Sequence, residues 1–406
     1  MRPIMRPSTL AALLALVSVL ACHPAAPPPS GLGPRPIAVT AVSLVESVPL
    51  DTSLGSPAIA DTAATWVEMI DGATERLDIS QFYVSAKPEG ALEPVLEAIE
   101  AAARRGVTVR LLVDTKFSVQ YPKTLERLGH LVEVRRWNVA ATLGGVQHAK
   151  YFVVDDRELY LGSANFDWRA LEHIHELGVR VRLPALARAL REQMDLDWSI
   201  ASGAPRRPGR RGWPVVTVGA DSYRLVSGPQ SALSDPAAFE LDHLLATLDA
   251  ASLRIAVQLL SYDTTFRDGR SFTALDAALR RAAARGVAVR LAVSHWQKRH
   301  PEAVQALARV PGITVRFITI PPHQSGFIPF ARTVHSKYMT VDGRRGWIGS
   351  SNWDGDYFHH SRNVGLLAEG PTLPRALELV FEQVWSSEYA EPVDPEAAYP
   401  APKVGP

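Results

Sequence analysis

The chain has 406 residues, of which 47% are hydrophobic and 21% charged. This composition is that of an ordinary globular protein and leaves room for two hydrophobic cores. The formal net charge is only +1 at pH 7, so a general electrostatic attraction to nucleic acid or to an anionic membrane has no support, and any anion site must be local.

The N-terminus has the pattern of a secretory signal. An apolar run at 10–21, too short to span a bilayer, follows two arginines and precedes Cys22, the single cysteine of the chain. Residues 19–22 resemble a bacterial lipobox, in which the cysteine is acylated and becomes the first mature residue. A plain signal peptide with an incidental cysteine is the alternative. We expect a signal peptide at 1–22, a Pro-rich tether at 23–40, and a lipid-anchored protein of the bacterial cell envelope, in the outer membrane facing the periplasm.

Beyond the tether, the chain repeats one pattern of predicted elements twice. An apolar strand at 77–83 is followed by an alanine-rich helix that ends at glycine, and then by an alternating, β-branched strand at 107–114. The same order returns with strands at 253–262 and 287–294. Strand–helix–strand alternation predicts α/β units with right-handed crossovers.

The repeat also predicts the domain organisation. We expect an N-terminal lobe at 41–202, a connecting loop at 203–214 and a C-terminal lobe at 215–396, followed by a short tail at 397–406. Each lobe then has the size of an ordinary domain. The arginines of the connecting loop are expected to be solvated rather than to form a phosphate site.

The strongest functional signal is a polar pattern that occurs once in each half. Its internal spacing is the same in both copies, and it combines His, Lys, Asp, Gly-Ser and Asn. The residues are His148, Lys150, Asp155, Ser163 and Asn165 in the first copy, and His335, Lys337, Asp342, Ser350 and Asn352 in the second. Chance explains a single copy of such a pattern, but not two complete copies at corresponding places of a repeat.

A β-hairpin explains why the spacing is conserved between the copies. If Asp156 and Arg157 are the two central residues of the turn, Lys150 lies opposite Ser163 and His148 lies opposite Asn165. The same register in the second copy sets Lys337 opposite Ser350 and His335 opposite Asn352, with an Asp-Gly turn. Asp155 and Asp342 fall on the other face, which predicts a structural role for both.

A cluster of these side chains suits a tetrahedral anion. Lysine supplies positive charge, asparagine and serine supply directional donors, and histidine acts as nucleophile or general acid near neutral pH. Two clusters that meet across a pseudo-twofold axis would place one histidine on each side of a phosphodiester. No cofactor and no metal site are expected, because the strand-spaced pair His173 and His175 has no third ligand.

This twin pattern resembles the signature of the phospholipase D superfamily, two H-x-K-x4-D motifs each followed by G-S-x-N. The resemblance covers most of the chain beyond the tether. It implies two α/β/α lobes with mixed sheets packed about a pseudo-twofold axis. It also implies metal-independent cleavage of a phosphodiester through a covalent phosphohistidine, in a monomer that carries both half-sites.

Shorter matches are similar to one branch of that superfamily, the lysosomal 5′-exonucleases (the third and fourth mammalian phospholipase D paralogues) and their poxvirus relatives. They include SQFY at 80–83, LGSANFDWRAL at 161–171 and SNWDGDYF at 351–358. The lysosomal members have disulfides and a transmembrane anchor, whereas this chain has one cysteine and a lipobox. The branch resemblance therefore leaves the compartment and the natural substrate open, but not the chemistry.

The superfamily also implies a carboxylate 28 residues after each motif histidine, hydrogen-bonded to that histidine. Glu176 holds this place in the first half, and Asn363 holds it in the second. If each residue supports the histidine of its own half, the carboxylate makes His148 the nucleophile and leaves His335 as the general acid.

The substrate stays open between the end of a single-stranded nucleic acid and a phospholipid. Four aromatic residues, Phe82, Tyr83, Trp353 and Tyr357, together with Phe358, would stack on bases, flank acyl chains or belong to the core. The branch resemblance favours a 5′-exonuclease, and a lipid anchor favours a phospholipase D or transphosphatidylase that resembles cardiolipin synthase. A catalytically silent phosphate-binding lipoprotein is the non-enzymatic alternative, and the two intact motifs argue against it.

Overall fold

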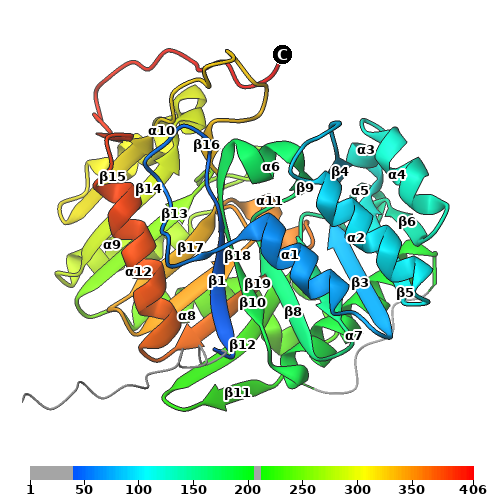
Figure 1. The fold of residues 1–406 in the computed structure, drawn as a ribbon. Helices are drawn as coiled ribbons and strands as arrows, with labels where there is room; N and C mark the ends of the chain where they lie inside the picture. The colour runs from blue at the N-terminus through cyan, green and yellow to red at the C-terminus, as the bar shows by residue number, and fades with distance from the viewer. Residues whose placement is uncertain (1–39, 205–211) are drawn as a thin grey trace, which may run out of the picture. The chain divides into compact units, whose positions relative to one another are not determined.

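The computed structural model describes residues 40–204 and 212–406 (Figure 1). The predicted signal peptide with Cys22, nearly all of the tether and the middle of the connecting loop lie outside the described residues. Within the described ranges, no helix combines the length and the apolar composition needed to cross a membrane.

Two mixed nine-stranded sheets organise the described residues. The first sheet has the order β2-β1-β10-β8-β7-β3-β5-β6, and β16 from the second half pairs with β10. Its strands are β1 (Val42–Ser47), β2 (Ala60–Asp61), β3 (Arg76–Gln81), β5 (Thr108–Asp114), β6 (Glu133–Trp137), β7 (Tyr151–Val154), β8 (Glu158–Gly162), β10 (Ile174–Val181) and β16 (Thr333–Val334).

The second sheet repeats this order as β11-β12-β19-β18-β17-β13-β14-β15-β20. Its strands are β11 (Val215–Val218), β12 (Asp221–Gly228), β13 (Arg254–Leu259), β14 (Ala288–Ser294), β15 (Ile313–Ile318), β17 (Lys337–Val341), β18 (Arg345–Gly349), β19 (Asn363–Glu369) and β20 (Ala390–Pro392). In both sheets the motif hairpin stands between a parallel part and an antiparallel part. A short pair, β4 (Val84–Ser85) and β9 (Phe166–Asp167), stands apart.

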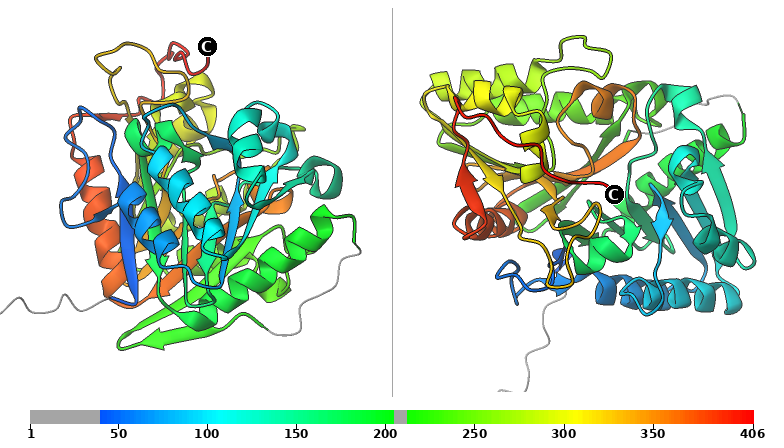
Figure 2. Two further views of the ribbon diagram at one scale, coloured as in Figure 1. Left: turned by 45° about the vertical axis from the view of Figure 1, so that its right-hand side comes forward. Right: turned by 90° about the horizontal axis from the view of Figure 1, so that it is seen from above.

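Helices cover the outer face of each sheet, as the two extra views show (Figure 2). In the first half α1 (Thr62–Asp71) and α2 (Glu93–Arg104) share one apolar core with the sheet, and in the second half α8 (Glu240–Asp249) and α9 (Ala274–Ala284) share another. A third core lies between the sheets and includes α7 (Pro184–Ala201) and α12 (Thr372–Trp385). The predicted duplicated α/β fold is therefore confirmed.

The remaining helices are short and connect these layers. They are α3 (Thr115–Ser118), α4 (Pro122–Gly129), α5 (Val139–Leu143), α6 (Trp168–Glu172), α10 (Glu302–Ala308) and α11 (Gly355–His359), with the 3-10 turns η1 (Gln230–Ala232), η2 (Pro236–Ala238) and η3 (His295–Arg299). The alanine-rich helices α2 and α9 are followed by Gly106 and Gly286, whose φ angles of 92° and 87° require the left-handed region that glycine adopts most easily.

The hairpin register differs by one residue from the predicted register. Val154 pairs with Glu158, so three residues rather than two separate the strands, and Lys150 lies opposite Gly162 rather than Ser163. The second hairpin has the same register, with Lys337 opposite Gly349 instead of Ser350. The pairings predicted for His148 with Asn165 and for His335 with Asn352 are wrong for the same reason.

The motif aspartate accounts for the longer loop. Asp155 has a φ of 49°, and its carboxylate accepts backbone hydrogen bonds from Thr74, Glu75 and Arg76 at 2.7–2.9 Å. Asp342, with a φ of 56°, makes the same contacts with residues 252–254. Each aspartate therefore leaves the strand and ties the hairpin turn to the start of the neighbouring strand.

Candidate active site

Each motif histidine is held by a backbone hydrogen bond to the opposite half. β16, directly before His335, pairs with the start of β10, and Val334 lies beside His175. The backbone N–H of His335 donates to the carbonyl of His175 at 2.9 Å. In the mirror contact, the backbone N–H of His148 donates to the carbonyl of Arg362 at 2.9 Å. Both histidines therefore stand at the junction of the two halves.

This exchange decides which side chain supports each imidazole ring. Glu176 follows His175, and both of its carboxylate oxygens lie 2.9 Å from Nδ1 of His335. Asn363 places its Oδ1 3.1 Å from Nδ1 of His148. The prediction that Glu176 and Asn363 support the histidine of their own half is therefore wrong, because each supports the histidine of the other half.

The two motif serines hold these supporting residues. The hydroxyl of Ser350 donates to Oδ1 of Asn363 at 2.9 Å, and the amide of Asn363 donates to the carbonyl of Tyr357 at 2.7 Å. In the first half, the hydroxyl of Ser163 is hydrogen-bonded to Glu176 and to the backbone of Leu177. Both serines are fully buried, so they orient the partners of the histidines.

The two lysines bring buried positive charge to the site. Lys150 and Lys337 have no exposed surface, and neither forms an ion pair with a carboxylate in the part of the chain that the structure describes. The ammonium of Lys150 donates to the carbonyl of His148 at 2.5 Å, and that of Lys337 donates to the carbonyl of His335. Burial lowers the pKa of Lys150 well below its usual range and lowers the pKa of Lys337 to about 7. The site is therefore built to gain stability from a bound anion.

The two histidines differ in how easily they take a proton. Burial lowers the pKa of His148 well below its usual value, and the positive charges of Lys150 and Lys337 lower it further. Burial also lowers the pKa of His335, but the charge of Glu176 opposes this change. The pKa of Glu176 stays below its usual value despite burial, because His335 and Lys337 stabilise the carboxylate. In the free protein His148 is neutral, and His335 is the more readily protonated of the two.

Both motif asparagines retain unused hydrogen-bonding capacity. The Oδ1 atoms of Asn165 and Asn352 are buried and have no hydrogen-bond partner among the described residues. The amide nitrogen of Asn165 lies 3.5 Å from the hydroxyl of Tyr83. Buried amides with unpaired atoms are expected to meet a ligand. This places one candidate ligand-binding amide beside each histidine–lysine pair.

Both histidines open onto one cavity of about 220 Å³. Aromatic rings from the first half form one wall: Phe82 lies 5.1 Å from the ring of His148 and 4.0 Å from Phe117, and Tyr83 stacks on Tyr121 at 5.2 Å. Phe117 and Tyr121 were not predicted. Their signal is their position directly after the strand at 107–114, where an α/β sheet presents its ligand-binding loops.

The remaining predicted aromatics divide between the cavity and the core. Tyr357 lines the cavity, with its ring 4.7 Å from that of His148. Trp353 is fully buried and packs against Trp347 at 6.3 Å, and Phe358 is also buried in the core. The prediction that Trp353 binds substrate is therefore wrong. Its side chain joins the apolar core of the second sheet instead of the cavity wall.

Two further cavity residues carry no clear sequence signal. Arg169 lines the cavity, and its guanidinium is held by Asp167 at 2.7 Å and by the hydroxyl of Tyr121 at 3.1 Å. Phe330 also lines it, with a φ of 59° and its backbone N–H bonded to the carbonyl of Val404 at 2.7 Å. The C-terminal segment, red in Figures 1 and 2, thus helps to fix one side of the cavity.

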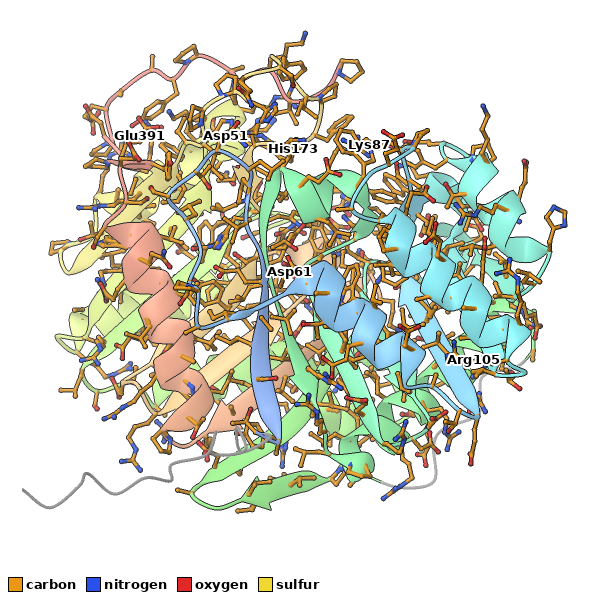
Figure 3. The ribbon with its side chains drawn as sticks, in the orientation of Figure 1. Asp51, Asp61, Lys87, Arg105, His173 and Glu391 are labelled. Carbon is orange, nitrogen blue, oxygen red and sulfur yellow. The ribbon has the colours of Figure 1, made fainter. Side chains whose placement is uncertain are left out.

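The strand-spaced histidines have separate surroundings. His175 is fully buried with its Nε2 2.8 Å from Glu46, whereas His173, labelled in Figure 3, packs edge-on against His323 at 4.8 Å. Across the described ranges, no group of three or more His, Cys, Asp or Glu side chains is placed to hold a metal ion.

Comparison with known proteins adds to this geometry. The family profile "Cardiolipin synthase, PLD-like domain" matches residues 66–198 and 244–385. The chain is 30% identical to the 5′-3′ exonuclease PLD4 of Mus musculus, over 86% of this chain and 79% of that protein. It is 30% identical to phospholipase D Z of Dictyostelium discoideum, over 87% of this chain and 90% of that protein. Phosphatidylserine synthase of Haemophilus influenzae matches 82% of this chain and 85% of its own with a TM-score of 0.61 and 14% identity, which shows a common fold.

Proposed function

The chain belongs to the phospholipase D superfamily, in the branch of the animal 5′-3′ exonucleases, and we propose that it hydrolyses a phosphodiester at the end of a single-stranded nucleic acid. The observation that carries this proposal is that both motif histidines line one cavity with an aromatic wall, and that each is hydrogen-bonded through its carbonyl to a buried lysine. The buried lysines attract the phosphate, and the rings offer flat surfaces on which unpaired bases stack.

The first step follows from the protonation states of the two histidines. Neutral His148 attacks phosphorus with Nε2, while Asn363 holds its Nδ1–H. His335, whose protonated form Glu176 stabilises, transfers its Nε2 proton to the leaving oxygen as the P–O bond breaks. Lys150 and Lys337, with the two motif asparagines, stabilise the charge on the non-bridging oxygens. The product is a phosphohistidine and a free alcohol.

The second step returns the site to its starting state. His335, now neutral, accepts a proton from a water molecule, whose oxygen attacks the phosphorus bound to His148. The N–P bond breaks, and a phosphate monoester leaves. The roles of the histidines are those proposed from sequence, but the reason is different: Glu176 supports the acid, whereas a neutral partner supports the nucleophile.

The size of the cavity and the nature of its wall support a nucleotide over a lipid. A volume of about 220 Å³ holds a phosphodiester with one or two rings, and lies below the range of roughly 300–1,000 Å³ typical of sites that enclose larger ligands. Phe82 and Tyr83 present ring faces and edges rather than an aliphatic channel. Relatives named phospholipase D make a lipid substrate the second candidate.

One assay separates these candidates. Purified full-length protein in mild detergent and EDTA is incubated with 5′-hydroxyl single-stranded DNA and, separately, with phosphatidylglycerol or cardiolipin vesicles. We expect mononucleotides from the DNA and none with the His148→Ala variant. Turnover of lipid alone would replace the nucleic-acid proposal with the lipid one. Binding of either substrate without turnover would identify a silent phosphate-binding protein.

We also propose that the mature protein is a monomer anchored through acylated Cys22 in the outer membrane. Both half-sites belong to one chain, so a second copy is not needed to complete the site. The anchor rests on the lipobox-like sequence, which lies outside the described residues.

A further inference from the structure

A second cavity opens beside the active-site cavity on the side of the second half. It has a volume of about 250 Å³, and Leu260 and Trp296 line both cavities. The remaining wall of the second cavity is mainly polar. It includes Ser261, Asp263, Gln297, Arg299, His300 and Asp354. A group attached to a phosphodiester at the histidines can therefore extend into it without leaving the protein surface.

The internal repeat shows which part of the first half this cavity corresponds to. In the first half Val84 pairs with Phe166 in a parallel bridge between β4 and β9. In the second half Tyr262 pairs with Trp353 in the same way. In each pair, one residue lies three places beyond the end of β3 or β13, and the other directly follows the motif asparagine. The positions beside these pairs can therefore be compared directly.

In the first half the corresponding place is filled by the protein itself. Tyr83, which precedes Val84, donates its phenol hydroxyl to Oδ2 of Asp167 at 2.7 Å. The Asp167 carboxylate also receives three hydrogen bonds from the guanidinium of Arg169, at 2.7–3.0 Å. Both oxygens of the Asp167 carboxylate are thus hydrogen-bonded, and the Tyr83 ring occupies this place in the aromatic wall.

In the second half the same place is open. Ser261 stands where Tyr83 stands in the first half, and its side chain is too short to fill the space. Asp354 stands where Asp167 stands, and its Oδ1 accepts only from the backbone N–H groups of Asp356 and Tyr357, at 3.1 and 3.2 Å. No side chain in the described part of the protein hydrogen-bonds to it. In the first half a tyrosine hydroxyl donates to this carboxylate, whereas in the second half the carboxylate lines a cavity.

The surroundings of Asp354 favour an additional hydrogen-bond donor to its carboxylate. Burial raises its pKa to about 7, although the two backbone donors and the charge of Arg267 oppose this rise. A ligand hydroxyl that donates to the carboxylate would replace the missing partner. A second phosphate is a poor ligand here, because Asp263 also lines the cavity and both carboxylates would repel it.

We propose that this second cavity is a subsite for a hydroxyl-bearing group of the substrate, which donates to Asp354 as the Tyr83 phenol donates to Asp167. The group is the one that stays on phosphorus after the leaving alcohol, protonated by His335, has departed. Its chemistry is that of a nucleotide sugar or of the glycerol of a lipid headgroup. This inference rests on the proposed phosphodiesterase activity.

Three chromogenic phosphodiesters with one leaving group test the subsite. They are thymidine 3′-(4-nitrophenyl phosphate), glycerol 4-nitrophenyl phosphate and methyl 4-nitrophenyl phosphate, and the methyl ester has no hydroxyl to offer. The measured quantity is kcat/KM for each hydroxylated ester divided by that for the methyl ester. Wild-type protein should prefer at least one hydroxylated ester by about tenfold or more, the effect of one hydrogen bond to a charged group.

Two variants remove the subsite in different ways. Ser261→Tyr fills the cavity with the ring found in the first half. Asp354→Asn keeps an oxygen that accepts from the backbone N–H groups of Asp356 and Tyr357, but it removes the negative charge. Both should reduce the preference about tenfold. Asp268→Asn, on an exposed turn of the same half, is the control and should keep it. If Ser261→Tyr lacks a cooperative thermal transition, Asp354→Asn decides alone.

The outcomes are separable from failure of the proposed function. If the variants lose the preference for the thymidine ester, the subsite binds a nucleotide sugar. If they lose the preference for the glycerol ester, it binds a lipid headgroup. A wild-type protein that cleaves the methyl ester as well as the others, or variants that keep the preference, would overturn the subsite while the phosphodiesterase activity stands. A wild-type protein that cleaves none of the three esters would refute the activity itself and the subsite with it.

Discussion

Glu240 is a fully buried carboxyl beside the second motif, and its replacement by glutamine should change how stability depends on pH. Its Oε1 accepts from the indole N–H of Trp347 at 2.9 Å, and its Oε2 accepts from the hydroxyl of Ser351, the residue before Asn352. Burial raises the pKa of Glu240 from 4.5 to about 7, and these two hydrogen bonds offset only part of the rise. The folded protein therefore keeps a proton that the unfolded chain loses.

The sign and size of the effect follow from this difference. A group whose pKa is raised by folding contributes stability that is complete below its unfolded pKa and is lost as the pH rises through its folded pKa. A rise from 4.5 to about 7 is worth about 3 kcal/mol at roughly 1.4 kcal/mol per pKa unit. Glutamine keeps an acceptor for Trp347, can donate to the Ser351 oxygen, and has no proton to lose. Between pH 5 and pH 8 the Glu240→Gln variant should gain about 2–3 kcal/mol relative to the wild type.

Urea unfolding followed by tryptophan fluorescence at pH 5 and pH 8 measures this gain. The quantity of interest is the free energy of unfolding of the variant minus that of the wild type, in which all other titrating groups cancel. Glu97→Gln, on the exposed side of α2, measures the effect of removing a surface carboxylate. A difference that is the same at both pH values would show that Glu240 ionises in the fold as easily as in the unfolded chain, and the argument from burial would be wrong.

The active site gives four further predictions, and the N-terminal cysteine gives one. His148→Ala and His335→Ala should each lower kcat by several orders of magnitude, because the two groups act as a unit, while EDTA should leave wild-type turnover unchanged. A 4-nitrophenyl ester needs little protonation, so it should partly restore His335→Ala but not His148→Ala; the opposite pattern would exchange their roles. Asn363→Asp should raise the pKa of His148 and move the acidic limb of the kcat/KM profile up by about one pH unit. A shift in the alkaline limb instead would show that Asn363 does not support His148. Because the pKa of Lys337 is about 7, kcat/KM should fall as the pH rises above 7 and the lysine loses its charge, and a flat profile to pH 9 would refute this. Cys22→Ser should release the protein from the membrane fraction or leave the signal uncut, and mass spectrometry that finds an unacylated mature N-terminus beyond residue 22 would disprove the lipid anchor.

The sequence alone determined the chemistry and the class of fold. The motif residues could be identified because their spacing is identical in two copies, and a strand preserves spacing through its two-residue period. The helices and strands of each half could be predicted from local periodicity and from the glycines that end α2 and α9, since these signals depend on neighbours in the chain. The aromatic pair Phe82 and Tyr83 was recognisable for the same reason, being the continuation of a predicted strand.

Only the tertiary structure decided how these parts meet. The one-residue change in hairpin register depends on Asp155 reaching the loop before β3, a contact with a distant segment. The burial of Trp353 depends on the core that α8 and α9 close over the second sheet. The support of His335 by Glu176 and of His148 by Asn363 depends on backbone hydrogen bonds between the halves. Such bonds form where the two sheets come into contact. Every residue other than proline has the same backbone N–H and carbonyl, so the sequence does not show which backbone groups pair.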